Sequence, residues 1–91
     1  MNPNFALAHY NLGIACRDGK KTNQAITAFR RAADLVPELL DAHFQLGKLY
    51  FEAGKKAEAQ KSFQEVVRLA PQSETAHMAR QYLDLLKKSG K

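Results

Sequence analysis

Residues 8–37 read AHYNLGIACRDGKKTNQAITAFRRAADLVP, and they return one period later as residues 42–71, AHFQLGKLYFEAGKKAEAQKSFQEVVRLAP. The same Ala-His pair begins a third time at Ala76. When the sequence is shifted against itself by 34 residues, 13 of the 57 aligned pairs are identical. A fixed period of this length is the signature of stacked supersecondary units, so the chain is predicted to be a repeat protein.

Each period contains two helical patterns. Apolar residues recur at steps of three and four, as in Leu12, Ala15 and Cys16 and then in Ile26, Phe29 and Ala33. This is the spacing of one face of a helix. We therefore predict an all-α fold with helices over 5–18, 22–35, 39–52, 56–69 and 73–88. Nowhere do β-branched residues alternate with polar ones, so no strand is expected.

Turn residues mark where these helices end. Gly19 is expected to take the positive φ that helix C-termini favour, with Thr22 as the N-cap of the next helix. Gly54 is expected to end the first helix of the second repeat in the same way. Pro37 and Pro71 should end the second helices, because proline disfavours helical geometry in the residue before it.

Small residues allow the helices of a pair to approach closely. Gly13 and Gly47 lie in mid-helix, where glycine costs close to 1 kcal/mol relative to alanine, and another helix is expected to pack against them. Ala25 and Ala59 are predicted to fill the facing positions. The large groups of the core are predicted to be Phe29 and Phe63.

The repeated residues resemble the tetratricopeptide repeat. The resemblance is carried by Leu12-Gly13, Ala25, Phe29, Ala32 and Pro37, and again by Leu46-Gly47, Tyr50, Ala59, Phe63 and Pro71. It implies a right-handed solenoid of helix-turn-helix units, with repeats at 6–39 and 40–73 and a capping helix with a basic tail at 74–91. Arg80-Gln81 replace Leu-Gly there, which suits a solvated cap. Residues 1–5 are interpreted as the tail of a preceding repeat or a linker.

Composition sets the class of protein. The 91 residues carry a net charge of +5 and are 45% hydrophobic, as in one small globular domain. No apolar run approaches the roughly 20 residues that a membrane-spanning helix needs. Residues 1–5 have neither the basic start nor the apolar stretch of a signal peptide, which favours the cytoplasm but leaves export of a longer chain open. The single cysteine, Cys16, excludes an intrachain disulfide and is interpreted as a buried, inert thiol.

No catalytic or metal-binding pattern is present in the sequence. A nucleophile, a base and an orienting group would have to converge in a pocket, and no phosphate-binding loop or His-Glu metal motif appears. His9, His43 and His77 recur at the repeat spacing, about a helix pair apart, whereas zinc needs bonds of roughly 2.1 Å. We predict a protein that is not an enzyme and has no cofactor and no metal.

The resemblance places a ligand groove on the inner face formed by the first helix of each repeat. The residues that map there as a binding site are Tyr10, Ile14, Phe44, Lys48, Phe51, Met78 and Tyr82. Some family members grip acidic C-terminal tails with a clamp of Lys, Asn and Arg, whose slots here hold Tyr10, Ile14, Gln45, Thr75 and Ala79. Without the clamp, we expect an apolar protein or peptide partner. The alternative is that Met78 and Tyr82 simply pack on Phe44 and close the array.

Two further kinds of partner are considered. Terminal repeats with an open apolar face could associate with a second copy of the chain, giving a homo-oligomer. Alternatively, a ridge of lysines could bind nucleic acid or lipid headgroups: Lys20, Lys21, Lys55, Lys56, Lys87, Lys88 and Lys91. Because no aromatic residue interleaves with them, we favour solvated turns over this ridge and expect neither a nucleic acid nor a membrane partner.

Overall fold

The structure is a computed structural model that describes residues 3–89, with side chains described from Phe5 to Lys88. It contains five helices: α1 (Pro3–Asp18), α2 (Thr22–Leu35), α3 (Leu40–Glu52), α4 (Lys56–Leu69) and α5 (Glu74–Ser89). No strand occurs in the described part of the chain. The all-α prediction is confirmed, and each predicted helix boundary agrees with the structure to within two residues.

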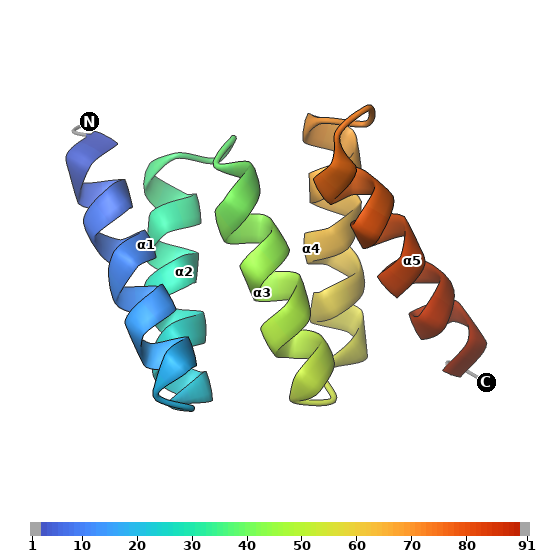
Figure 1. Cartoon of the computed structure of the whole chain (residues 1–91), viewed down its shortest axis with the longest axis horizontal. Helices are drawn as coiled ribbons and strands as arrows, with labels where there is room; N and C mark the ends of the chain where they lie inside the picture. The colour runs from blue at the N-terminus through green and yellow to red at the C-terminus, as the bar shows by residue number, and fades with distance from the viewer. Residues whose placement is uncertain (1–2, 90–91) are drawn as a thin grey trace.

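The helices form a row that follows the order of the chain (Figure 1). α1 pairs with α2 and α3 with α4, and the second helix of each pair packs against the first helix of the next unit, α2 on α3 and α4 on α5. The molecule measures 40 × 29 × 18 Å. No helix within residues 3–89 is long and apolar enough to cross a membrane.

Two phenylalanines form the centres of two core clusters. Phe29 and Phe63 are fully buried, one in each repeat. A β-carbon built on Gly13 would lie 2.7 Å from the Phe29 ring, and one built on Gly47 would lie equally close to the Phe63 ring. The atoms nearest the glycines therefore belong to the phenylalanine rings, and the facing positions of Ala25 and Ala59 stay a prediction.

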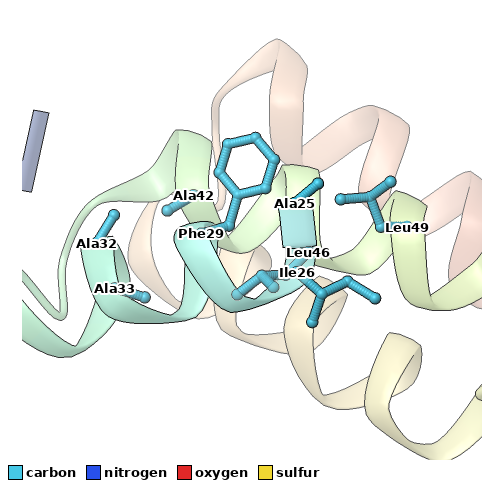
Figure 2. Packing of buried hydrophobic residues seen from close by; sticks show 8 residues of the cluster. All are labelled: Ala25, Ile26, Phe29, Ala32, Ala33, Ala42, Leu46 and Leu49. Atoms are coloured by element: carbon cyan, nitrogen blue, oxygen red, sulfur yellow. The ribbon is translucent and has the colours of Figure 1, made fainter. Parts of the chain in front are cut away.

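The alanines belong to the same two cores. Ala25 and Ala59 are fully buried beside the rings, where a larger side chain would have no room. Figure 2 shows the first cluster, which α2 and α3 build together with the residues Ala25, Ile26, Phe29, Ala32, Ala33, Ala42, Leu46 and Leu49. Because these residues come from both repeats, the cluster joins the two units into one body.

The turn within each repeat differs from the prediction by one residue. Lys20, not Gly19, takes the positive φ, at 62°. Its counterpart 34 residues later is Gly54, with a φ of 78°. In the first turn, Lys21 N–H donates to the Cys16 carbonyl at 2.8 Å and Lys20 N–H to the Arg17 carbonyl at 3.0 Å. This pair of bonds is a Schellman motif, which requires a left-handed residue just after the helix whatever its side chain.

Helix capping also differs from the prediction. Thr22 is the first residue of α2, and the N-cap is Lys21, which makes no side-chain capping bond. Thr22 is not the cap because the Lys21 carbonyl already accepts the first hydrogen bond of α2, from Ala25 N–H at 2.9 Å. Instead, Ser73 caps α5: its Oγ accepts a hydrogen bond from Ala76 N–H at 3.0 Å and donates to the Ala70 carbonyl at 2.8 Å.

The two ends of the chain depart from the repeat. α1 begins at Pro3, whereas Pro37 lies in the turn before α3 and Pro71 in the turn before α5. Of the predicted preceding tail at 1–5, residues 1 and 2 lie outside the described part, and residues 3–5 form the first turn of α1. In α5, Arg80 is exposed and its Nη2 donates to the Pro71 carbonyl at 2.8 Å.

Candidate functional site

A hollow of about 420 Å³ lies between α3 and α5. Phe44 and Lys48 line it from α3, four residues apart and so on one face of the helix. α5 contributes residues at steps of three and four along its own face: Met78, Gln81, Tyr82 and Leu85. This α3–α5 hollow brings together four of the seven residues that the sequence places in a groove.

Stacked aromatic rings form the base of the α3–α5 hollow. The rings of Phe63 and Tyr82 stack with their centroids 4.7 Å apart and their planes 5° from parallel. Phe44 meets Phe63 edge-on at 5.9 Å and Tyr82 edge-on at 6.3 Å. Because Phe63 is fully buried, it fixes the other two rings in place. The alternative prediction thus holds for Tyr82, which packs on Phe44.

Two apolar side chains of the α3–α5 hollow remain in contact with solvent. Met78 is 42% exposed and Leu85 is 51% exposed. Both lie on α5, seven residues apart and therefore two turns apart on the same face. An apolar group that entered the hollow would cover both of them.

Among residues 3–89, Lys48 is the only charged residue that lines this hollow. Its Nζ lies 5.0 Å from the centroid of the Phe44 ring, which is the geometry of a cation–π contact. The described part of the chain contributes no acidic side chain to the lining of the hollow. The site therefore offers apolar surface with a single cation at its edge.

Tyr10, Ile14 and Phe51 do not line the hollow. Tyr10 packs edge-on against Phe29 with 5.4 Å between the centroids, and Ile14 is half-buried against the same core. Burial raises the pKa of the Tyr10 phenol above its ordinary value. Phe51 packs edge-on against Tyr82 at 5.2 Å, on the core that α4 and α5 share. The structure therefore does not join the seven predicted residues in one trough.

The positions that correspond to an acidic-tail clamp are used in other ways. The Gln45 side chain accepts a hydrogen bond from Arg17 Nη1 at 2.9 Å, which links α1 to α3. Ala79 is fully buried in the second core and cannot contact a ligand.

Leu85 and Gln81 are the lining residues that the sequence analysis missed. The signal was the helical spacing, because Leu85 follows Met78 by seven residues and Tyr82 by three. Treating 74–91 as a solvated cap stopped the apolar stripe at Tyr82, although it continues for one more turn.

The other candidate residues are placed as follows. Cys16 is half-buried, so the expectation of a buried thiol is wrong. His9 and His43 are half-buried and His77 is exposed, and His43 Nε2 lies 2.8 Å from the Pro37 carbonyl oxygen. Among the residues described, no cluster of three His, Cys, Asp or Glu side chains could hold a metal ion.

The predicted lysine ridge lies at one end of the helices. Lys20 and Lys21 are exposed in the α1–α2 turn, and Lys55 and Lys56 at the α3–α4 turn. Figure 1 shows both turns on the same side of the molecule, where α5 also ends with Lys87 and Lys88 in its last turn. Lys91 lies outside the described residues.

Comparison with known proteins identifies the repeat. A family model described as a tetratricopeptide repeat matches residues 17–83, which is most of the chain and includes α2 to α4 entirely. A search of curated proteins finds no match.

Proposed function

The chain belongs to the tetratricopeptide repeat family, and we propose that it binds an apolar peptide or helix of a partner protein in the α3–α5 hollow, without catalysis. Members of this family generally act as protein–protein interaction modules. One observation carries the proposal: the exposed side chains of Met78 and Leu85 stand beside a fixed aromatic base.

Residue chemistry supports an apolar ligand. Aromatic and methionine anchors often carry most of the binding energy of an interface, about 2 kcal/mol or more apiece when they are buried. Here Phe44 and Tyr82 are already ordered by Phe63, so binding orders few additional groups. Met78 is unbranched and adapts to the shape of a ligand. Phe51 supports Tyr82, while Tyr10 and Ile14 hold the neighbouring core.

An acidic tail is not the expected ligand. Lys48 can neutralise one carboxylate or steer an acidic partner, but no second cation lines the hollow among the residues that the structure describes. The chain therefore selects its partner by apolar contact, and charge contributes mainly to the rate of association.

The proposal can be tested by phage display. Peptides are selected from a random library with the full chain as bait. We expect enriched peptides with at least two apolar anchors, and we expect Leu85→Asp to weaken their binding at least tenfold. Leu85 is exposed, so this variant should keep its helix content, which circular dichroism checks.

Leu12→Asp is the matched control, because Leu12 is equally exposed, at 53%, but lies on α1. Binding that survives Leu85→Asp would contradict the proposal, as would selection of acidic peptides without apolar anchors. A dimer detected by light scattering that Leu85→Asp dissociates would instead assign the hollow to a second copy of the chain.

A further inference from the structure

Six exposed lysines lie at one end of the helices. Figure 1 shows the α1–α2 turn, the α3–α4 turn and the end of α5 on the same side of the molecule. We call the lysines at these three places the lysine edge: Lys20, Lys21, Lys55, Lys56, Lys87 and Lys88. Together with Arg17 they outnumber the acidic residues of the same region, which are Asp18, Glu52, Glu58 and Asp84. This end of the molecule is therefore positively charged.

The fold does not account for all of these lysines. Lys21 and Lys55 are 34 positions apart and correspond, but the counterpart of Lys20 is Gly54 and that of Lys56 is Thr22. The two repeats thus place a lysine pair at the same end in different ways. Lys20 has a φ of 62°, a conformation that glycine adopts at lower cost. Within residues 3–89, no ion pair of the structure uses Lys20, Lys21 or Lys55.

The opposite end of the helices is acidic. Exposed carboxylates gather around the α2–α3 and α4–α5 loops, which Figure 1 shows at that end: Asp34, Glu38, Asp41 and Glu74. Two arginines of this region already have partners, since Arg68 pairs with Glu65 and Arg80 donates to the Pro71 carbonyl. A large anionic surface would therefore attract the lysine edge and repel the other end, so the charge pattern fixes how the molecule stands on it.

The shape of the lysine edge favours a flat anionic surface over a nucleic acid. Its lysines stand on turns and helix ends, whereas single-stranded nucleic acids lie in basic grooves with aromatic rings on which the bases stack. The nearest aromatic residues of α3, Tyr50 and Phe51, are half-buried against the cores. Lipid headgroups diffuse within the bilayer, so they can match the spacing of the lysine pairs, whereas the phosphates of a duplex have a fixed spacing.

Although the sequence alone favours solvated turns, this charge pattern leads us to propose that the lysine edge binds the surface of a membrane rich in anionic lipids. The helices then stand upright on the membrane, with the acidic loops away from it. None of the six lysines lines the α3–α5 hollow, so a peptide can bind there while the chain is on the membrane. The contact is electrostatic and is weakened by salt.

Sedimentation of the full chain with lipid vesicles tests the proposal. One set of vesicles is phosphatidylcholine alone, and the other contains equal parts of phosphatidylcholine and phosphatidylserine. We expect the chain to sediment only with the anionic vesicles and to be released by high salt. Because a lysine close to an anionic bilayer changes the partition coefficient about fivefold, each double variant of the turns, Lys20→Gln with Lys21→Gln or Lys55→Gln with Lys56→Gln, should lower it at least tenfold.

Two further variants separate the lysine edge from net charge and from folding. Arg31→Gln with Lys61→Gln removes the same charge from exposed positions within α2 and α4, and it should lower the partition coefficient less than threefold. Lys20→Gly removes one lysine of the edge but suits the backbone of the turn. It should weaken vesicle binding about fivefold although the fold becomes more stable, and loss of structure cannot produce that combination.

Three results would overturn the proposal. These are a chain that stays in solution with the anionic vesicles at low salt, equal losses from the Arg31 and Lys61 control and from the turn variants, and unchanged binding of Lys20→Gly. Duplex DNA and single-stranded RNA are titrated in parallel at the same salt. Tighter binding to either than to the vesicles, lost in the turn variants, would assign the lysine edge to a nucleic acid instead of a membrane.

Discussion

Lys20 sits in a backbone conformation that suits glycine. Its φ of 62° lies in the left-handed region, which costs a residue with a β-carbon roughly 1 kcal/mol. The counterpart Gly54 has no heavy atom near the place where a β-carbon would be. We expect Lys20→Gly to stabilise the fold by about 1 kcal/mol and to raise the Tm by several degrees in a thermal melt.

The neighbouring glycine is the control for this experiment. Gly19 has no positive φ, so Gly19→Ala should not destabilise the protein in the way that Gly54→Ala does. A melt in which Gly19→Ala costs more than Gly54→Ala would contradict the assignment of the turn.

Gly47 and the Phe63 ring lie in close contact in the second repeat. Phe63→Ala should cost about 3 to 5 kcal/mol of unfolding free energy, because it empties a fully buried site. Gly47→Ala should cost about 1 to 3 kcal/mol, because its new methyl group would lie 2.7 Å from the ring.

A double-mutant cycle measured by denaturant unfolding isolates this contact. In a Phe63→Leu background, the cost of Gly47→Ala should be clearly smaller, since the edge of the ring is gone. If the losses of unfolding free energy from Gly47→Ala and Phe63→Leu were additive, contact with the Phe63 ring would not be the reason for glycine at position 47.

At the scale of single elements, α5 depends on its first turn. It packs mainly on α4, with further ring contacts from Tyr82 to α3, and Ser73 supplies its capping hydroxyl. Ser73→Ala should cost about 1 kcal/mol. The loss should appear first as faster hydrogen exchange of α5 amides, because an end helix opens before the rest of the fold.

Removal of a hydroxyl from another helix is the matched control. Thr27 Oγ1 donates to the Asn23 carbonyl within α2 at 3.1 Å, an intrahelical bond that a helix does not need. Thr27→Ala should leave exchange in α5 unchanged. Equal exchange rates in the wild type and Ser73→Ala would show that the cap does not stabilise α5.

The helices could be predicted because each helical pattern of the sequence occurs in both repeats. Apolar spacing and prolines located all five to within two residues. The details of the turns could not be predicted. The left-handed residue is set by hydrogen bonds to the carbonyls of Cys16 and Arg17, and not by the position of a glycine in the sequence.

The candidate site was predicted in part. Spacing found Phe44, Lys48, Met78 and Tyr82, but the packing of Tyr10 on Phe29 depends on the approach of α1 to α2, which no spacing reveals.

At the scale of the whole molecule, the α1–α2 and α3–α4 turns with their lysines lie at one end of the helices, and none of Lys20, Lys21, Lys55 and Lys56 lines the α3–α5 hollow. Any retention of the chain on heparin should therefore be lost when Lys20, Lys21, Lys55 and Lys56 are replaced by Gln, with helix content unchanged. Peptide binding to the α3–α5 hollow should persist in the same variant. Unchanged retention on heparin would exclude this edge as the site of anion binding.

The central claim is that apolar contact in the α3–α5 hollow selects the partner, with Lys48 in a secondary role. The most direct measurement is a calorimetric titration of one selected peptide into the wild type, Phe44→Ala and Lys48→Gln at physiological salt, with the folded fraction of each variant checked by its melt. We expect Phe44→Ala to raise the Kd at least tenfold, and we expect Lys48→Gln to matter mainly at low salt. A larger loss from Lys48→Gln at physiological salt would contradict the claim, because charge would then select the ligand.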